Sequence, residues 1–327
     1  MSAAPLSATR RIAVVGAGLA GLACARALHE AGVAVTLFDR HAEPGGRCAT
    51  LRSPAGPFDH GLPWLAAGTE RYAGQLRAWS DAGWLAPDPS APGRWIAQPT
   101  MQSLPARLAD GLLFAGSLEI AALERDGPHW LLRPHQAAPF GLDLSFDAVV
   151  VAMPAEQSVP LLGGDPALAD AMRTVRSEPC WTVTAAWPVA LPIRDDELHS
   201  PDDVLQRARR DDRRPGRPRL DGTRWVLHAN AYWSANNLDV REPDVVKRLL
   251  DAFARAVGVR LARPSYAAAQ LWRHAEVALP HTTPYGWNAE LQLGACGDAW
   301  HAREGAQGAE RAWLSGRSLG EHIAAGA

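Results

Sequence analysis

The chain has 327 residues, of which 47% are hydrophobic, and its formal net charge is -2. This length can bury one large core or two coupled cores, and the composition excludes disordered and fibrous proteins. Because the net charge is small, nothing favours binding to nucleic acid or to an anionic membrane, and we expect a small-molecule partner.

The cysteines and the N-terminal segment give no sign of secretion. The four cysteines, Cys24, Cys48, Cys180 and Cys296, form no CxxC pair and do not cluster with histidine, so neither a disulfide framework nor a metal site is indicated. The first eleven residues lack an apolar signal core, and no run approaches the roughly 18 apolar residues of a membrane helix. We therefore expect a reduced, cytoplasmic protein without a membrane segment.

The first predicted element is a buried strand, Ile12 to Val15, which leads into a turn with GxGxxG spacing. Gly16 permits the tight turn, and Gly18 lets the backbone approach a diphosphate. Gly21 allows the following helix to pack closely on the strand. The free N–H groups at the start of this helix would face the phosphates.

Gly32 is placed to end the helix before a second strand, Val33 to Phe38, which leads to Asp39. Asp39 stands close to the position at which an acid accepts the ribose hydroxyls of an adenosine, which argues against a 2'-phosphate there. A glycine-rich turn in an ordinary α/β unit is the alternative. Strand, turn, helix, strand and acid in this order favour a dinucleotide site.

Further along the chain, other segments favour FAD over a nicotinamide cofactor. Arg47 follows two glycines, Gly45 and Gly46, and offers a guanidinium that can meet a second phosphate oxygen. The FDHG sequence at 58–61 places another acid and a glycine near the far end of an extended cofactor. A small meander and a buried strand are predicted from the alternating segments 118–123, 129–133 and 142–154.

The C-terminal part repeats the pattern of an apolar strand that runs into a glycine and an acid. The segment 293–300 contains Gly297 and Asp298, and a helix is predicted over 310–323. Asp298 would bond a ribityl hydroxyl or a pyrophosphate-linked group, while the helix directs its positive end at the cofactor.

Together, VVGAGLAGL with Asp39, then GGR, FDHG, the AMP sequence at 152–154, GD and AWLSG resemble the FAD-binding half of the amine oxidase and glutathione reductase-type flavoproteins. WVLHANAYWSANNLD (225–239), LWRHAEV (271–277) and CGDAW resemble the renalase family more narrowly. This resemblance implies noncovalent FAD that oxidises isomeric dihydronicotinamide dinucleotides, 2- or 6-dihydro-NAD(P), to NAD(P)+. Molecular oxygen would then be reduced to hydrogen peroxide.

The resemblance also implies which residues contact the flavin, with the backbone of Ile120 pairing with adenine. The implied contacts are Gly16, Gly18, Ala20, Gly21, Asp39, Gly46, Arg47, Gly61, Leu62, Ile120, Gly297 and Asp298. Two departures from the family pattern affect the substrate side. Leu62 and Pro63 stand where relatives commonly carry a polar amide, and the segment 299–309 is longer than in bacterial members.

A second sheet should present the substrate to the flavin. Strands are predicted over 179–191, 224–233 and 271–277, and an amphipathic helix over 244–258. The residues expected to face the flavin are His228, His274, Trp272, Trp64 and Trp233. Flat aromatic walls would hold a flat ring against the isoalloxazine. Hydride removal from a dihydropyridine needs no general base, so the histidines are assigned to orientation and polarity.

The predicted fold is therefore α/β, with a Rossmann-like FAD-binding domain of the glutathione reductase type and an α+β substrate domain on a mainly antiparallel sheet. We assign 1–61, 111–154 and 291–327 to the first domain, and 62–110 and 155–290 to the second. The arginine-rich segment 207–219 is predicted to be an exposed loop. It would be a solvated linker, or alternatively a mobile cationic rim that meets a substrate diphosphate.

Two other functions remain open. The first is an oxidase of amines or other small reduced carbons, whose members typically hold a water near flavin N5 with a lysine. The only lysine here, Lys247, lies in an amphipathic helix and is expected to point to solvent. The second is a flavin-binding protein without catalysis, closed by the altered loop after Gly61. Cys296, next to Gly297, could tether the flavin, although a buried small residue is favoured.

Overall fold

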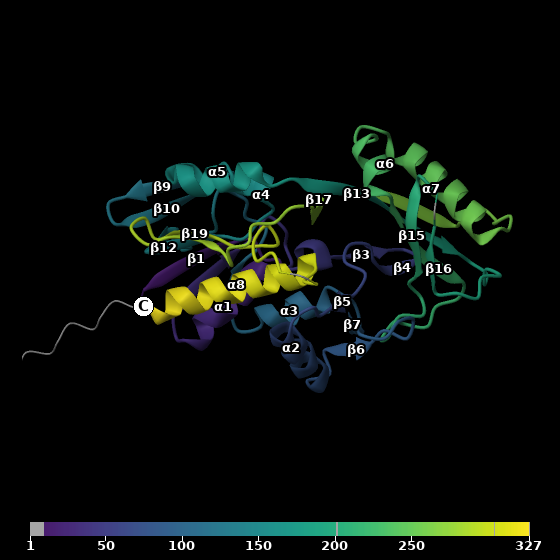
Figure 1. Ribbon diagram of the computed structural model, residues 1–327, viewed down its shortest axis with the longest axis horizontal. Coiled ribbons are helices and arrows are strands. Elements are labelled where there is room, and N and C mark those ends of the chain that lie inside the picture. Colours follow the sequence, from purple (N-terminus) through teal and green to yellow (C-terminus); the bar gives the residue numbers. More distant parts are fainter. Residues whose placement is uncertain (1–9, 201, 304, 327) are drawn as a thin grey trace, which may run out of the picture.

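The computed structural model describes residues 10–200, 202–303 and 305–326. We expected the first eleven residues to lack a signal core, and the first nine of them lie outside the described residues. The molecule is elongated and has a layered part at one end and a second sheet with its own helix at the other (Figure 1). Two long strands, β13 (Ser177–Trp187) and β17 (Tyr266–Val277), run from one part to the other.

The layered part is built on a six-stranded sheet. In spatial order it contains β18 (Gly286–Asn288), β19 (Leu293–Ala295), β12 (Ala148–Val151), β1 (Arg11–Val15), β2 (Ala34–Phe38) and β8 (Leu113–Ala115). All neighbours are parallel except β18 and β19, which pair antiparallel. The central strands are buried on both faces, as their continuous apolar sequences predict.

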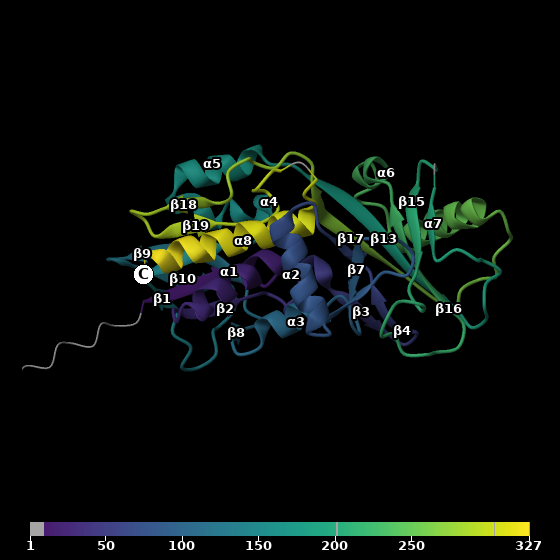
Figure 2. The ribbon, with the colours of Figure 1, turned by 60° about the horizontal axis from the view of Figure 1, so that its bottom comes forward.

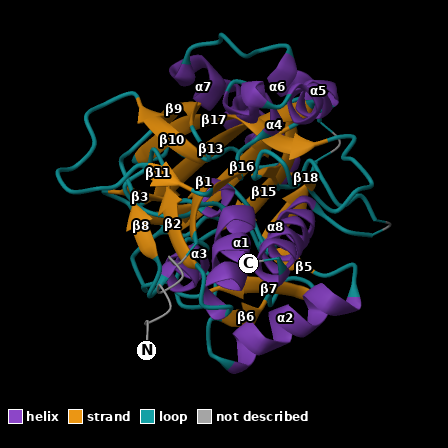
Figure 3. Cartoon of the chain, turned by 90° about the vertical axis from the view of Figure 1, so that its left-hand side faces the viewer, coloured by secondary structure: helices purple, strands orange, loops and turns teal. Residues whose placement is uncertain are grey.

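Different layers cover the two faces of this sheet. Helices α1 (Leu19–Glu30) and α8 (Gly308–Ala325) lie side by side on one face (Figure 3). The other face is covered by a three-stranded meander and by helical segments. These are β9 (Ile120–Asp126), β10 (His129–Pro134), β11 (Ser145–Phe146), α4 (Ala155–Ser158), the short 3-10 helix Leu161–Gly164 and α5 (Pro166–Thr174). The meander and the strand pattern predicted from the sequence are confirmed.

Segment 62–110, which we assigned to the substrate domain, buries its apolar side chains together with those of α1 and α8. Tyr72, Trp79 and Trp313 contact one another in this core. The elements of this segment are β5 (Leu65–Ala66), α2 (Glu70–Asp81), β6 (Leu85–Pro87), β7 (Arg94–Ala97) and α3 (Ser103–Ala109). Figure 2 shows α2 and α3 beside α1.

The second part is a five-stranded antiparallel sheet. Its spatial order is β14 (Glu197–His199), β15 (Leu205–Arg210), β16 (Thr223–Ala229), β13 (Ser177–Trp187) and β17 (Tyr266–Val277). Helix α7 (Glu242–Val257) covers one face and packs its apolar stripe on a core that includes Trp225 and Leu227. Gly258 ends this helix in the left-handed region at φ 68°, as predicted. The opposite face turns toward the hairpin of β3 (Thr50–Ser53) and β4 (Gly56–Asp59).

The strand predicted over 224–233 is too long. The side-chain oxygen of Asn230 accepts hydrogen bonds from the backbone N–H groups of Tyr232, at 2.8 Å, and Trp233, at 3.4 Å. This cap begins the short helix α6 (Ala231–Ala235), because an asparagine at this position satisfies free N–H groups of the first turn. Trp233 therefore stands on a helix and not on the sheet.

The prediction of an exposed loop over 207–219 is wrong. This segment begins within β15, and Arg209, Arg210, Arg214 and Arg217 are all buried. Arg209, Arg214 and Arg217 pair with carboxylates from other segments, and Arg210 pairs with Asp212 of the same segment; these partners offset the cost of burying the charges. Neither a solvated linker nor a mobile cationic rim describes this segment.

Within the described parts of the chain, every helix is too short or too polar to span a bilayer.

Helices α1 and α8 touch through their backbones. A Cβ atom on Gly316 would lie 1.9 Å from the carbonyl oxygen of Ala20, and one on Gly320 would lie 2.6 Å from that of Cys24. Only glycine allows so close an approach, and this approach keeps the middle of α8 against the first turns of α1.

The substitution Gly316→Ala should therefore destabilise the fold by about 1 to 3 kcal/mol, because the added methyl group forces the two helices apart. Urea unfolding followed by circular dichroism measures the change. Gly326→Ala, at the end of the same helix, is the matched control, since its Cβ atom would meet only carbonyl oxygens at 3.9 and 4.0 Å. Equal stability of the two variants would contradict the close-packing role.

Candidate functional site

The glycine-rich turn has the geometry that its sequence predicts. Gly16 adopts φ 111°, and a Cβ atom there would lie 2.4 Å from the carbonyl oxygen of Ala152. A Cβ atom on Gly21 would lie 1.8 Å from the carbonyl oxygen of Gly16. Gly18 is different, because a Cβ atom there would meet no described atom within 4 Å. The turn is thus closed at Gly16 and Gly21 and open at Gly18.

The N-terminus of α1 is free to hold an anion. Its cap residue is Gly18, and within the described chain no side chain caps the first turn and no acidic residue lies in it. Free N–H groups at a helix N-terminus bind phosphate readily. The open side of Gly18 and these N–H groups therefore fit the diphosphate of a dinucleotide.

Asp39 holds this turn in place. One carboxylate oxygen accepts a hydrogen bond of 2.7 Å from the Ala17 N–H, and the other accepts one of 2.8 Å from the His41 N–H. Segment 117–120 lies beside it, since the Leu118 N–H donates to the Asp39 carbonyl at 2.9 Å. Asp39 and Ile120, the two residues expected at the adenosine, are therefore neighbours. Binding of a ribose by Asp39 stays a prediction.

Arg47 and Asp298 form a bidentate pair. Nη1 and Nη2 of Arg47 donate to the two Asp298 oxygens at 2.6 and 2.7 Å, and Nη1 also reaches the Ala275 carbonyl at 3.2 Å. The guanidinium pairs with Asp298, and its contact with a phosphate stays a prediction. The backbone before it does lie against the turn, because the Gly45 N–H donates to the Ala17 carbonyl at 3.0 Å.

Gly297 and Cys296 lie beneath this pair. The Gly297 N–H donates to Ser315 Oγ at 3.2 Å, which joins the end of β19 to α8. Cys296 is 2% exposed and belongs to the core with Cys24. A hydrogen bond to Cys24 and burial raise the pKa of the Cys296 thiol well above its usual range. An inert buried thiol of this kind is a poor tether for a flavin.

Two of the predicted substrate-side residues meet the loop at Gly61. Nε2 of His228 lies 3.2 Å from the Gly61 carbonyl oxygen, and Nε1 of Trp272 donates to the His60 carbonyl at 3.0 Å. The ring of Trp272 also contacts the ring of His60, with 4.9 Å between centroids. Leu62 follows, and its N–H donates to the Arg47 carbonyl at 2.8 Å.

The two histidines at this point are neutral near pH 7. Burial lowers the pKa of His228 to about 3, and the charge of Arg207 acts in the same direction. Burial lowers the pKa of His60 to about 4, although the charge of Asp59 opposes this. Among the described residues, Nδ1 of each ring is buried without a hydrogen-bond partner. Such atoms are candidates for contacts with a bound molecule.

The other three predicted residues have different surroundings. Nδ1 of His274 pairs with Glu156 at 3.1 Å, and its carbonyl oxygen lies 3.5 Å from Arg47 Nη1. Trp233 packs in the core between the sheet and α7, on the face opposite to His228, so it cannot line the predicted site. Trp64 is buried, and Arg94 lies over its ring at 3.6 Å from the centroid. An arginine, and not a flat substrate, occupies that face.

Asp59, the acid of FDHG, belongs to a buried ion cluster that was not predicted from the sequence. Arg217 Nη2 lies 2.6 Å and Arg214 Nε 3.2 Å from Asp59 Oδ2, and Arg217 also pairs with Asp211 at 2.9 Å. Arg214 donates to the Pro63 carbonyl at 2.8 Å. This cluster holds the loop between Asp59 and Trp64 from the side opposite to Arg47. Alternating arginine and aspartate in 207–219 was its only signal.

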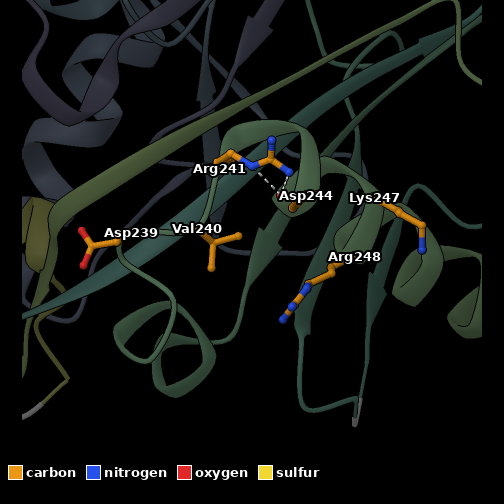
Figure 4. Close-up of a pocket in the computed structure, with 6 residues that line it drawn as sticks. All are labelled: Asp239, Val240, Arg241, Asp244, Lys247 and Arg248. Atoms are coloured by element: carbon orange, nitrogen blue, oxygen red, sulfur yellow. Dashed lines mark hydrogen bonds and ion pairs between the residues drawn. The ribbon is translucent and has the colours of Figure 1, made fainter.

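One hollow in the surface lies outside this region. Figure 4 shows it at the start of α7, lined by Asp239, Val240, Arg241, Asp244, Lys247 and Arg248. Arg241 pairs with Asp244 at 2.8 Å, and Lys247 with Asp251 at 3.2 Å. The Lys247 side chain is 77% exposed, as predicted. Because α7 covers the face opposite to His228, this hollow is separate from the candidate site.

Comparison with known proteins agrees with these features. A family model described as an NAD(P)-binding Rossmann-like domain matches residues 14–79. The tRNA 5-methylaminomethyl-2-thiouridine biosynthesis bifunctional protein of Magnetococcus marinus is 37% identical over 95 residues, which cover 27% of this chain and 14% of that protein. Hydroxyneurosporene desaturase of Cereibacter sphaeroides is 53% identical over 51 residues, 16% of this chain and 10% of that protein. The chain thus matches only a small part of the length of each relative.

A solved structure matches almost the whole chain. Cyclohexylamine oxidase from Brevibacterium oxydans superposes with a TM-score of 0.75 at 14% sequence identity, over 98% of this chain and 99% of that one. The predicted fold class, a Rossmann-like part joined to a part with an antiparallel sheet, is therefore confirmed.

The substitution Arg217→Met should lower the free energy of unfolding by about 3 to 5 kcal/mol, because it leaves two buried carboxylates short of a partner. Urea unfolding measures this loss. Arg213→Met is the matched control: Arg213 is an exposed arginine of the same segment, and its replacement should change stability by at most about 0.5 kcal/mol. Similar losses in both variants would show that the cluster has no special role.

Stability should also depend on pH through His228. An unfolded histidine has a pKa of about 6.5. Since the folded pKa of His228 is depressed to about 3, the unfolded chain binds a proton that the folded chain does not, and stability falls as pH decreases below about 6.5.

We expect His228→Gln to reduce the slope of the unfolding free energy against pH by about 1 kcal/mol per pH unit between about pH 6 and pH 5. Urea unfolding at a series of pH values measures it, and His135→Gln, at an exposed position, is the control. An unchanged slope in His228→Gln would contradict the burial of a neutral ring.

Proposed function

We propose that this protein is an FAD-dependent oxidoreductase. The observation that carries the proposal is the N-terminus of α1, which opens at Gly18 and lacks a cap within the described chain. The backbone N–H groups there would hold the diphosphate, with Asp39 at the ribose. The Arg47 and Asp298 pair lies further along, at the start of α8, where a longer cofactor would continue. The similarity to a Rossmann-like domain and the fold shared with an amine oxidase support this assignment.

The bound FAD would be noncovalent, because the thiol of Cys296 is buried against Cys24. When bound, FAD supplies the acceptor for two electrons and a proton, transferred as hydride to N5, and passes the electrons to molecular oxygen to give hydrogen peroxide. The residues of this chain would bind the donor, orient its ring and keep water from it.

We further propose that the donor is an isomeric dihydronicotinamide dinucleotide, 2- or 6-dihydro-NAD(P), which becomes NAD(P)+. The resemblance to the renalase family supports this donor. The histidines at Gly61 support it too, because their lowered pKa values make them weak bases, and oxidation of a dihydropyridine needs no proton transfer to a base. Trp272 offers a flat apolar surface beside them.

Amine oxidation is the second candidate, and the similarity of fold to cyclohexylamine oxidase favours it. Against it stands Lys247, the only lysine of the chain, which pairs with Asp251 on the outer surface of α7. No lysine is therefore available to hold a water at the flavin.

Anaerobic mixing of the purified protein with each donor separates the possibilities. Denaturation should first release free FAD into solution. Addition of 2- or 6-dihydro-NAD(P) should then bleach the flavin absorbance of the native protein, and amines such as cyclohexylamine should leave it unchanged. Bleaching by amines alone would support the second candidate. No bleaching by any donor would indicate a flavin-binding protein without catalysis.

A further inference from the structure

Three guanidinium groups surround the indole of Trp64. The Cζ atoms of Arg94, Arg207 and Arg209 lie 3.6, 4.3 and 5.3 Å from the centroid of its ring. Two carboxylates share the space. The Trp64 cluster, as we call it, consists of Trp64, Asp88, Arg94, Glu197, Arg207 and Arg209.

The carboxylates do not satisfy all three guanidinium groups. Asp88 binds Arg209 at 2.7 Å, and Glu197 binds Arg94 at 2.8 Å. The same Glu197 lies 3.4 Å from Arg207 Nε and 3.6 Å from Arg209 Nη1, contacts that do not form hydrogen bonds. Within the described chain, both of these nitrogen atoms are buried without a hydrogen-bond acceptor, and Oε1 of Glu197, which lies beside Arg207 Nε, likewise accepts no hydrogen bond.

Buried donors of this kind are costly, since an unpaired charged group loses its hydration without replacement. Three positive groups face two negative ones, and the side chain of His199 adds a further contact to Glu197 at 2.8 Å. The cluster therefore holds more guanidinium groups than carboxylates. Arg94 and Arg207 keep 24% and 20% of their side chains exposed, so an anion can reach them from solvent.

The cluster lies next to the proposed donor site. Arg207 on β15 pairs directly with His228 on β16, so both side chains project from the same face of the sheet. His228 contacts Gly61, three residues before Trp64. A molecule whose ring lies against His228 and Trp272 would thus have its remaining part near Arg207.

We propose that the Trp64 cluster is a binding site for a phosphate-type oxyanion, and that it receives the diphosphate of the dinucleotide donor. The second part of this statement rests on the proposed function. A planar guanidinium binds two phosphate oxygens through two parallel N–H groups. Stacking on the indole face positions the guanidinium and leaves its N–H groups free to donate. Arg207 keeps a fifth of its side chain exposed, and Arg209 lies deeper.

Calorimetric titration of the full-length protein with inorganic pyrophosphate tests the site directly. Excess FAD is present throughout, so that the N-terminus of α1 is already filled. We expect saturable binding by the natural protein and a Kd raised about tenfold or more in Arg207→Gln, because a hydrogen bond to a charged group is lost. Arg207→Lys keeps the positive charge but loses the two parallel N–H groups, so its Kd should lie between those of the natural protein and Arg207→Gln.

Arg213→Gln is the matched control, since this arginine lies in the same segment and is exposed. Arg94→Gln, on a different strand, is a second variant in case Arg207→Gln does not fold, as judged by circular dichroism. Absence of pyrophosphate binding in the natural protein would overturn the proposal. Equal binding in the folded Arg207→Gln or Arg94→Gln variants and in the control would overturn it as well.

Steady-state kinetics then separates the site from its assigned ligand. Arg207→Gln should raise KM for the dihydronicotinamide dinucleotide and leave KM for the dihydronicotinamide riboside, which has no phosphate, unchanged. An equal rise for both donors would contradict diphosphate binding by the cluster. If no dihydronicotinamide reduces the flavin but pyrophosphate binding depends on Arg207, the proposed function fails and the anion site stands.

Discussion

The pair between Arg47 and Asp298 is the interaction on which the candidate site depends. Asp298 has only 4% of its side chain exposed, and a carboxylate so buried requires a partner with good geometry. Arg47 supplies two parallel hydrogen bonds and also contacts a carbonyl of β17. The pair thereby joins the segment after β2, the end of β19 and the long strand that leads to the second sheet.

A second group of buried charges fixes the other side of the same loop. Asp59 is held by Arg214 and Arg217, while Gly61 lies against the Arg47 backbone. The loop from Asp59 to Trp64 is therefore held by ion pairs at Asp59 and by a backbone hydrogen bond from Leu62 to Arg47. This explains why Gly61 is needed: a Cβ atom there would lie 2.1 Å from the Arg47 carbonyl oxygen.

The two parts of the molecule contribute in different ways. The layered part offers backbone N–H groups at the start of a helix, which suit a diphosphate whatever side chains surround it. The second sheet offers side chains on one face only, because α7 and its apolar core occupy the other. The neutral His228, Trp272 and Arg207 on that face provide surfaces for a ring and for an anion.

Local sequence determined the β1, α1 and β2 unit, the end of β19 and helix α7, because glycine positions and apolar spacing act over a few residues. Those features place the expected cofactor residues near one another. Only the tertiary structure determined that 207–219 is largely buried. Its arginines pair with Asp59 and Asp88, which lie more than a hundred residues away in the chain. It likewise placed Trp233 in the core and Trp64 among arginines. An isolated arginine-rich segment favours water, and long-range carboxylates reversed that preference.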